Sequence, residues 1–199
     1  MIAVILAGGR SSRMLSVDKC LHNLGGTSLL EIIYRKLERS REFTDIHVLA
    51  SHLNANHLID LGFNVIIDNI LAGPLTAIYQ LRIFNEFFVI ACDTPFISIE
   101  SIKRLLSMCI NSASACIPRW RSTRYLEPLF AIYRSKAIDL LEICLLKGEL
   151  SINRCLNNSE SIMYLDVDQV FKDPRGELFN INTLDDLNKI KDLVIIHLY

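Results

Sequence analysis

The sequence predicts an α/β fold in which a mostly parallel sheet is flanked by helices on both faces. Three observations lead to this prediction. Short apolar runs alternate with helical patterns along the whole chain, as expected for parallel strands joined by crossover helices. The run at 87–91 is apolar throughout, which is typical of a central strand buried on both faces. A glycine-rich loop follows the first apolar run, at the end of a strand where open α/β sheets bind ligands.

In the first half of the chain, apolar runs predict strands at 2–6, 46–50, 65–67 and 87–91. Ser28 and Glu31 have the spacing of a capping box ahead of apolar residues that repeat at helical intervals as far as Leu37. A short helix is expected to end at Gly62. Gly73-Pro74 begins another helix, because proline is tolerated in the first turn.

In the second half, a helix begins near Ser98, and further apolar runs predict strands at 115–117, 129–133 and 163–167. Helical patterns occupy 135–146 and 151–156, and Thr183 is placed to cap a last helix. No linker, repeat or low-complexity tract interrupts the pattern. Because fewer than about 250 residues fit one hydrophobic core, residues 1–199 are expected to form a single domain.

Composition excludes several classes of protein. The 199 residues are 51% hydrophobic, which is too apolar for a disordered chain. With 21 basic and 22 acidic side chains, the net charge of −1 attracts neither nucleic acid nor an anionic membrane, so we expect neither as a partner. The apolar runs at 1–7 and 193–196 are too short for a signal peptide or for the roughly 20 residues that span a bilayer, which predicts a cytoplasmic protein.

The cysteines are scattered without a C-x-x-C pair, at Cys20, Cys92, Cys109, Cys116, Cys144 and Cys155. We expect buried free thiols in a reducing cytosol, because this spacing suits neither a zinc site nor a compact disulfide framework. The alternative is a set of intracellular disulfides of the kind found in hyperthermophiles.

The loop at 6–19 has the composition of a phosphate-binding loop. The consecutive Gly8 and Gly9 let the backbone approach a ligand closely and direct N–H groups at an anion. Three cationic side chains lie within ten positions of one another: Arg10, Arg13 and Lys19. The segment matches neither the P-loop nor the dinucleotide motif. It therefore predicts a triphosphate site, with a solvated Gly/Ser loop as the alternative.

Asp93 comes two residues after the most apolar strand and is predicted to bind a metal. It would lie at the end of a central strand, beside the cation-rich loop. Mg²⁺ prefers one or two carboxylates together with phosphate oxygens and waters. The alternative is an aspartate that caps the turn before Pro95.

Short segments along nearly the whole chain resemble the molybdenum cofactor guanylyltransferases. They are Leu6-Ala7-Gly8-Gly9, Ser12-Arg13-Met14, Asp18-Lys19, Val65-Ile66-Ile67-Asp68, Gly73-Pro74-Leu75, Cys92-Asp93-Thr94-Pro95, Pro128-Leu129 and Asn180-Ile181-Asn182-Thr183. The resemblance implies a Rossmann-like nucleotidyltransferase fold. It also implies transfer of GMP from GTP to the phosphate of molybdopterin or molybdenum cofactor, with Mg²⁺ as cofactor and pyrophosphate as product. Contact with proteins that deliver or receive the cofactor is left open.

The same resemblance implies roles for individual residues. Catalytic roles fall to Arg13, Lys19 and Asp93, with Asp93 as the metal ligand. Contacts to nucleotide or metal are implied for Leu6, Ala7, Gly8, Gly9, Lys19, Asp68, Gly73, Asp93, Asn180 and Asn182. For Asp68, a turn-forming aspartate is the alternative. Leu-Ala-Gly-Gly accompanies guanylyl transfer, whereas cytidylyl transferases of this group tend to have Leu-Ala-Ala-Gly.

The chain departs from the family pattern at three positions. The family has glycine where this chain has Leu15 and Ala77, and proline where it has Leu184. If position 15 requires a positive φ, leucine would strain the loop by about 1–3 kcal/mol. Two alternatives therefore stay open. One is a related transferase that uses CTP with molybdopterin, or GTP with another small phosphorylated acid. The other is a nucleotide-binding accessory protein without turnover.

The segment at 119–125 is predicted to bind the acceptor. Its residues of interest are Arg119, Trp120, Arg121, Arg124 and Tyr125. Arginine suits bidentate phosphate contacts, and an aromatic ring offers a face to a planar ligand such as a pterin. We expect this loop to face the first loop across Asp93. Single-stranded nucleic acid and an ordinary arginine-rich surface are the alternatives.

Overall fold

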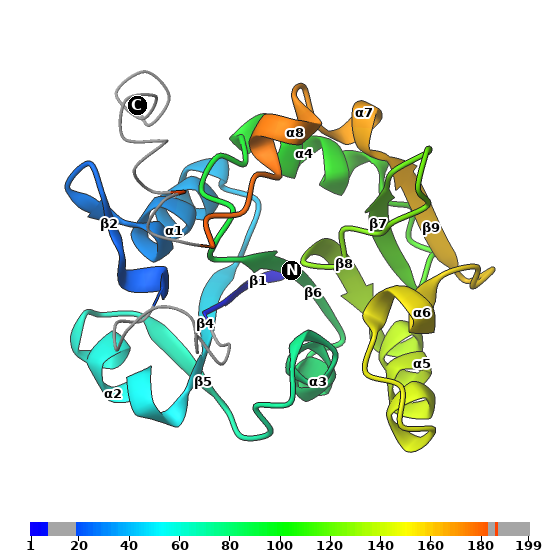
Figure 1. Cartoon of the computed structure of the whole chain (residues 1–199), viewed down its shortest axis with the longest axis horizontal. Helices are drawn as coiled ribbons and strands as arrows, with labels where there is room; N and C mark the ends of the chain where they lie inside the picture. The colour runs from blue at the N-terminus through cyan, green and yellow to red at the C-terminus, as the bar shows by residue number, and fades with distance from the viewer. Residues whose placement is uncertain (8–18, 183–185, 187–199) are drawn as a thin grey trace.

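The computed structural model describes residues 1–7, 19–182 and 186, and its centre is a seven-stranded sheet. The strands of this sheet are β1 (Ile2–Leu6), β4 (Asp45–Ser51), β5 (Asn64–Asp68), β6 (Glu86–Ala91), β7 (Ala115–Arg119), β8 (Phe130–Arg134) and β9 (Ile162–Asp166). Their order is β5-β4-β1-β6-β8-β7-β9 (Figure 1). A separate antiparallel pair is formed by β2 (Asn23–Leu24) and β3 (Thr27–Ser28).

The helices connect these strands. They are α1 (Leu29–Ser40), α2 (His52–Asp60), α3 (Pro74–Gln80), α4 (Ile99–Met108), α5 (Ser135–Leu146), α6 (Ile152–Leu156), α7 (Val167–Val170) and α8 (Pro174–Glu177). Two 3₁₀ turns, η1 (Lys19–Leu21) and η2 (Leu81–Ile83), complete the elements that are described. Among these helices, none combines the length and the apolar character needed to cross a membrane.

The sheet is mostly parallel, as predicted. The strands β5, β4, β1 and β6 pair in parallel, and so do β7 and β9. Only β8 is antiparallel to its neighbours, β6 on one side and β7 on the other. Every strand except β8 therefore runs in one direction, and their carboxyl ends share one edge of the sheet. Residues that follow β1, β6, β7 and β9 meet at that edge, where open α/β sheets bind ligands.

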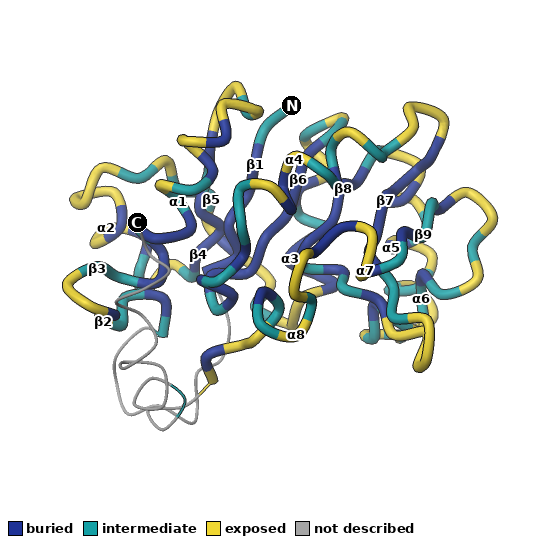
Figure 2. Tube along the Cα trace, turned by 90° about the horizontal axis from the view of Figure 1, so that it is seen from above, coloured by how far each residue is buried: buried dark blue, intermediate teal, exposed yellow. Residues whose placement is uncertain are grey.

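The core lies on both faces of the sheet. Apolar side chains of α1, α2 and α4 cover one face, and those of α3, α5 and α6 cover the other (Figure 1). Because successive side chains of a strand point to opposite faces, Phe88 packs on Phe43 and Phe130 while Phe87 stacks on Tyr133. Figure 2 shows the central strands buried and the outer loops exposed.

The predicted elements lie close to the observed ones, with a few differences. Ser28 Oγ accepts a hydrogen bond from the Glu31 backbone N–H at 3.1 Å. The Glu31 carboxylate accepts a hydrogen bond from Arg35 at 2.5 Å. Of the two hydrogen bonds of the predicted capping box, the structure therefore shows the one to the Ser28 side chain. The predictions missed the β2–β3 pair and the short helices α7 and α8. Thr183, the predicted cap of a last helix, lies outside the described residues.

The expectation of free thiols is wrong. Disulfides join Cys20 to Cys92, Cys109 to Cys116 and Cys144 to Cys155, with Cα–Cα distances of 5.6, 5.7 and 5.9 Å. Each bond connects two different elements, such as η1 with the end of β6, or α5 with α6. Folding brings these positions together, and a search for local spacing motifs does not detect such pairs.

Candidate active site

The candidate site begins where β1 and β6 end side by side. The Cys92 backbone N–H donates to Leu6 O at 3.2 Å, and the Ala7 N–H donates to Leu49 O at 2.9 Å. Leu6 and Ala7 are both buried. Hydrogen bonds to both neighbouring strands therefore fix the start of the first loop, and Asp93 comes two residues after β6 at the same edge.

The Lys19 ammonium lies between two oxygens from distant parts of the chain. Its Nζ is 2.7 Å from Asp93 Oδ2 and 2.7 Å from Asn182 Oδ1. The Ile181 N–H donates to Asp93 O at 2.9 Å, which holds the segment around Asn182 against the end of β6. Asp93 Oδ1 is buried and has no hydrogen-bond partner among the residues described. The structure thus brings together three residues predicted from three separate motifs.

A cavity of about 340 Å³ opens beside Asp93. Its lining includes Asn180 from the segment after α8, and Tyr125 and Glu127 from the loop between β7 and β8. Burial raises the pKa of Glu127, although the hydrogen bond of 2.5 Å that it accepts from Trp120 Nε1 acts in the opposite direction. The cavity therefore combines the predicted metal ligand with an aromatic ring and further polar groups.

Asp68 and Gly73 shape the turn between β5 and α3. Asp68 is buried, and its Oδ1 accepts from the backbone N–H groups of Ile70 and Leu71 at 3.0 and 2.9 Å and from Gln80 Nε2 at 2.5 Å. This oxygen therefore has the turn-forming role that the sequence left open. Gly73 has φ 113° and ψ −177°, a region that is almost restricted to glycine.

A half-buried lysine and a buried glutamate support the turn after Asp93, and the sequence analysis missed this pair. Lys36 Nζ donates to Pro95 O at 2.5 Å, and Glu177 Oε2 accepts from the Ser98 N–H at 2.8 Å. Burial lowers the pKa of Lys36 to about 8, while the nearby Glu177 carboxylate acts to raise it. No local pattern marks this pair, because α1 and α8 meet the turn only in the folded chain.

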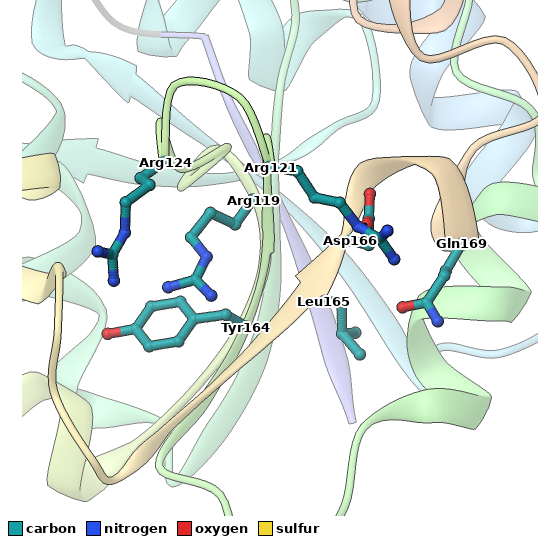
Figure 3. Close-up of a pocket in the computed structure, with 7 residues that line it drawn as sticks. All are labelled: Arg119, Arg121, Arg124, Tyr164, Leu165, Asp166 and Gln169. Carbon is teal, nitrogen blue, oxygen red and sulfur yellow. The ribbon is translucent and has the colours of Figure 1, made fainter.

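The three predicted acceptor arginines do not line the cavity beside Asp93. Arg119, Arg121 and Arg124 surround a second hollow of about 430 Å³, which also includes side chains of β9 and α7 (Figure 3). Tyr125 comes from the same loop but lines the cavity of Asp93. The side chains of this loop thus divide between two hollows.

Comparison with known proteins identifies the family. Residues 3–162 match the model of the MobA-like NTP transferase domain, which is more than half of the chain. The chain belongs to this family. It is therefore a nucleotidyltransferase with the Rossmann-like fold that the sequence predicts.

Relatives of this MobA-like NTP transferase match nearly its full length. A protein named probable molybdenum cofactor guanylyltransferase from Thermococcus gammatolerans is 35% identical over 191 residues, which cover 96% of this chain and 98% of the relative. The molybdenum cofactor guanylyltransferase of Haemophilus influenzae is 30% identical over 196 residues, which cover 94% and 95%.

Solved structures agree with the fold of this MobA-like NTP transferase. Molybdopterin-guanine dinucleotide biosynthesis protein A from Archaeoglobus fulgidus superposes with a TM-score of 0.75 at 27% identity, covering 97% of this chain and 98% of that one. The inositol-1-phosphate CTP transferase from T. maritima has a TM-score of 0.69 at 15% identity, covering 98% and 96%, and shares the fold.

The site of this MobA-like NTP transferase fits the Mg²⁺ that the family resemblance implies. Asp93 has one buried carboxylate oxygen without a partner, and a cation already lies between its other oxygen and the Asn182 amide oxygen. Carboxylate and amide oxygens are ligand types that Mg²⁺ accepts, together with phosphate and water. Over residues 1–7, 19–182 and 186, no cluster of three His, Cys, Asp or Glu side chains is present, at Asp93 or elsewhere, so phosphate and water would supply the other ligands of the metal.

Several predicted residues lie outside the described part of this MobA-like NTP transferase. They are Gly8, Gly9, Arg10, Arg13, Leu15 and Leu184. Ala77, where the family has glycine, is described: it is buried in α3, and its N–H donates to Gly73 O at 3.1 Å. Its backbone is helical, a conformation that alanine favours over glycine by about 0.8–1.0 kcal/mol. The backbone at this position therefore does not require glycine.

Proposed function

We propose that this nucleotidyltransferase moves GMP from GTP to the phosphate of molybdopterin or molybdenum cofactor, in the presence of Mg²⁺, and releases pyrophosphate. The names of its relatives support the substrate class. One structural observation carries the proposal. Lys19, Asp93 and Asn182 meet at the carboxyl edge of the sheet, where a triphosphate, a metal and an acceptor phosphate can approach one another.

The reaction requires the formation of one P–O bond and the breaking of another. An oxygen of the acceptor's phosphate attacks the α-phosphorus of GTP. The bond from that phosphorus to the β-phosphate oxygen breaks, and pyrophosphate leaves with the electron pair. The acceptor phosphate is already an anion, so no side chain is needed as a general base. The contribution of the protein is positioning and neutralisation of charge.

The described residues supply these two contributions. Asp93 and Asn182 would hold the metal through side-chain oxygens, and the bound Mg²⁺ would neutralise phosphate charge. Lys19 provides an ammonium beside the same oxygens and would stabilise the triphosphate and the departing pyrophosphate. Arg13, from the loop outside the described residues, is proposed to act with it. The buried backbone of Leu6 and Ala7 is held at the edge where the nucleotide would bind.

The decisive experiment measures pyrophosphate release from GTP with and without molybdopterin. Parallel reactions with CTP and ATP test the choice of base. We expect release that requires GTP, molybdopterin and Mg²⁺ together. Faster release with CTP would assign the chain to cytidylyl transfer. Binding of GTP without any release, with a competent acceptor present, would favour the accessory protein without turnover.

Substitution at Asp93 tests the mechanism directly. Asp93→Asn removes the charge that pairs with Lys19 and that would hold the metal, so turnover should fall at least about 100-fold. Asp60→Asn, on an exposed position of α2, is the matched control and should keep wild-type turnover. Near-wild-type pyrophosphate release by Asp93→Asn in the presence of Mg²⁺ would contradict the assignment of this carboxylate.

A further inference from the structure

We propose that the hollow between β7, β9 and α7 is a second anion site, which binds a ligand with phosphate oxygens outside the cavity of Asp93. The hollow has a volume of about 430 Å³, within the range of small-molecule sites, and its lining includes three arginines (Figure 3). Because β7 and β9 run in the same direction as β6, this hollow lies at the same edge of the sheet as Asp93.

Arg119 is held in position before any ligand binds. Its guanidinium carbon lies 4.3 Å from the centroid of the Tyr164 ring, in a cation–π contact. The ring itself is fixed, because the Tyr164 hydroxyl donates to Leu156 O at 2.5 Å and accepts from the Ser159 N–H at 2.8 Å. An aromatic face restrains the guanidinium without neutralising its charge.

Arg124, which lies beside Arg119 in the hollow (Figure 3), is restrained in a similar way. Its Nη2 donates to Asn158 Oδ1 at 3.0 Å, and its backbone N–H donates to Trp120 O at 2.8 Å. Both Arg124 and Asn158 have positive φ, 58° and 69°, which non-glycine residues seldom adopt. Such backbone persists where the surroundings hold it firmly. The side-chain partner of Arg124 is again neutral.

The charges of the lining favour an anion. Asp166 is the one carboxylate among the lining residues, and it forms an ion pair with Arg121. The guanidinium groups of Arg119 and Arg124 have neutral side-chain partners, so among the lining residues that the structure describes two positive charges have no paired carboxylate. The amide of Gln169 extends from α7 on the opposite side of the hollow (Figure 3). Restrained guanidinium groups with several N–H donors suit phosphate oxygens better than a single point charge does.

The same loop forms a wall of both hollows and carries a natural reporter. Trp120 is the single tryptophan of the chain, and its N–H donates to Tyr125 O at 2.9 Å. Its indole N–H donates to Glu127, which lines the cavity of Asp93 together with Tyr125. An anion bound by the arginines should therefore change the fluorescence of Trp120.

The test is a fluorescence titration of the full chain with inorganic pyrophosphate, without Mg²⁺. We expect a saturable change in Trp120 emission. The double variant Arg119→Gln, Arg124→Gln should lose affinity at least about tenfold, because each charge-assisted hydrogen bond contributes strongly to phosphate binding. The matched control Arg35→Gln, Arg104→Gln removes two exposed arginines of α1 and α4 and should keep wild-type affinity. Circular dichroism verifies that each variant is folded.

Lys19→Gln separates this site from the nucleotide site. Binding that persists in Lys19→Gln and is lost in the double arginine variant supports the proposal. The reverse result, or equal losses in the double arginine variant and its control, overturns it, as does the absence of a saturable response in the wild type. Parallel titrations with glycerol phosphate distinguish the source of the phosphate oxygens. Tighter binding of pyrophosphate indicates a free diphosphate, and equal binding indicates the phosphate group of an organic molecule.

Discussion

Lys36→Met should change how the free energy of unfolding depends on pH. In the folded chain, burial lowers the pKa of Lys36 to about 8, against an ordinary value of 10.5 for a lysine in water. At pH values between these two, the unfolded chain binds more protons at this position than the folded chain does. The contribution of Lys36 to stability therefore rises with pH through this window, and methionine removes that rise.

The magnitude follows from the two pKa values. Each pKa unit corresponds to about 1.36 kcal/mol, so the full difference is worth about 3 kcal/mol once the amine is neutral in both states. About 1 kcal/mol of this should be gained between pH 7 and pH 9, and about 2.5 kcal/mol by pH 10. The neutral amine can still donate to Pro95 O, so the contact at the turn survives the titration.

Urea unfolding of the wild type and of Lys36→Met at pH 7, 9 and 10 measures the effect. The difference between the two proteins isolates Lys36, because the other titrating groups are common to both. Lys103→Met, which removes an exposed lysine of α4 that lies 3.9 Å from Glu42, should remain parallel to the wild type. If the free energies of the wild type and Lys36→Met also stay parallel from pH 7 to pH 10, the amine is not desolvated and the reasoning fails.

Three further predictions concern the fold. Alanine at both Cys20 and Cys92 removes the disulfide that joins residues 72 positions apart, and the free energy of unfolding should fall by about 4 kcal/mol. A loss no larger than the loss from removing either of the other two disulfides, which close shorter separations, would contradict this. Phe88→Ala should cost about 3–5 kcal/mol in denaturant unfolding, because the ring is fully buried, and a cost below about 1 kcal/mol would place it outside the core. Gly73→Ala should cost about 1–3 kcal/mol through backbone strain, and unchanged stability would argue against the φ of 113°.

Much of the fold could be predicted from the sequence because the strands and helices have strong local patterns. The run at 87–91 is buried along its whole length as β6, and Ser28 begins α1 as its cap. The sequence says less about the direction of β8, because an apolar run is equally compatible with a parallel and an antiparallel strand. The absence of a helical pattern between β7 and β8 is a usable sign, because a parallel pair needs a crossover of a dozen or more residues.

The candidate site also contains some residues that local sequence patterns predict and some contacts that they do not. Lys19, Asp93 and Asn182 follow or precede recognisable elements, and the shared edge of a parallel sheet brings such positions together. Contacts between distant residues carry no local signal. Lys36 reaches Pro95 across 59 positions and Glu177 reaches Ser98 across 79, so their pairing follows from tertiary packing alone. The disulfide between Cys20 and Cys92, 72 positions apart, escaped prediction for the same reason. The other two join cysteines 7 and 11 positions apart, but they connect different elements whose packing the spacing alone does not reveal.

The position of Lys19 affects how the binding of metal and the binding of nucleotide should be coupled at the proposed site. An ammonium has three N–H donors, and here Asp93 and Asn182 accept from two of them. The chain therefore stabilises the Asp93 charge with its own cation, which avoids the cost of an unpaired, partly buried carboxylate. If Mg²⁺ arrives with the nucleotide, it brings positive charge to Asp93 just as the triphosphate brings negative charge to Lys19. Each group exchanges one oppositely charged partner for another, so neither charge is left unpaired. Metal and nucleotide should then bind with positive coupling, and Lys19→Gln should weaken that coupling.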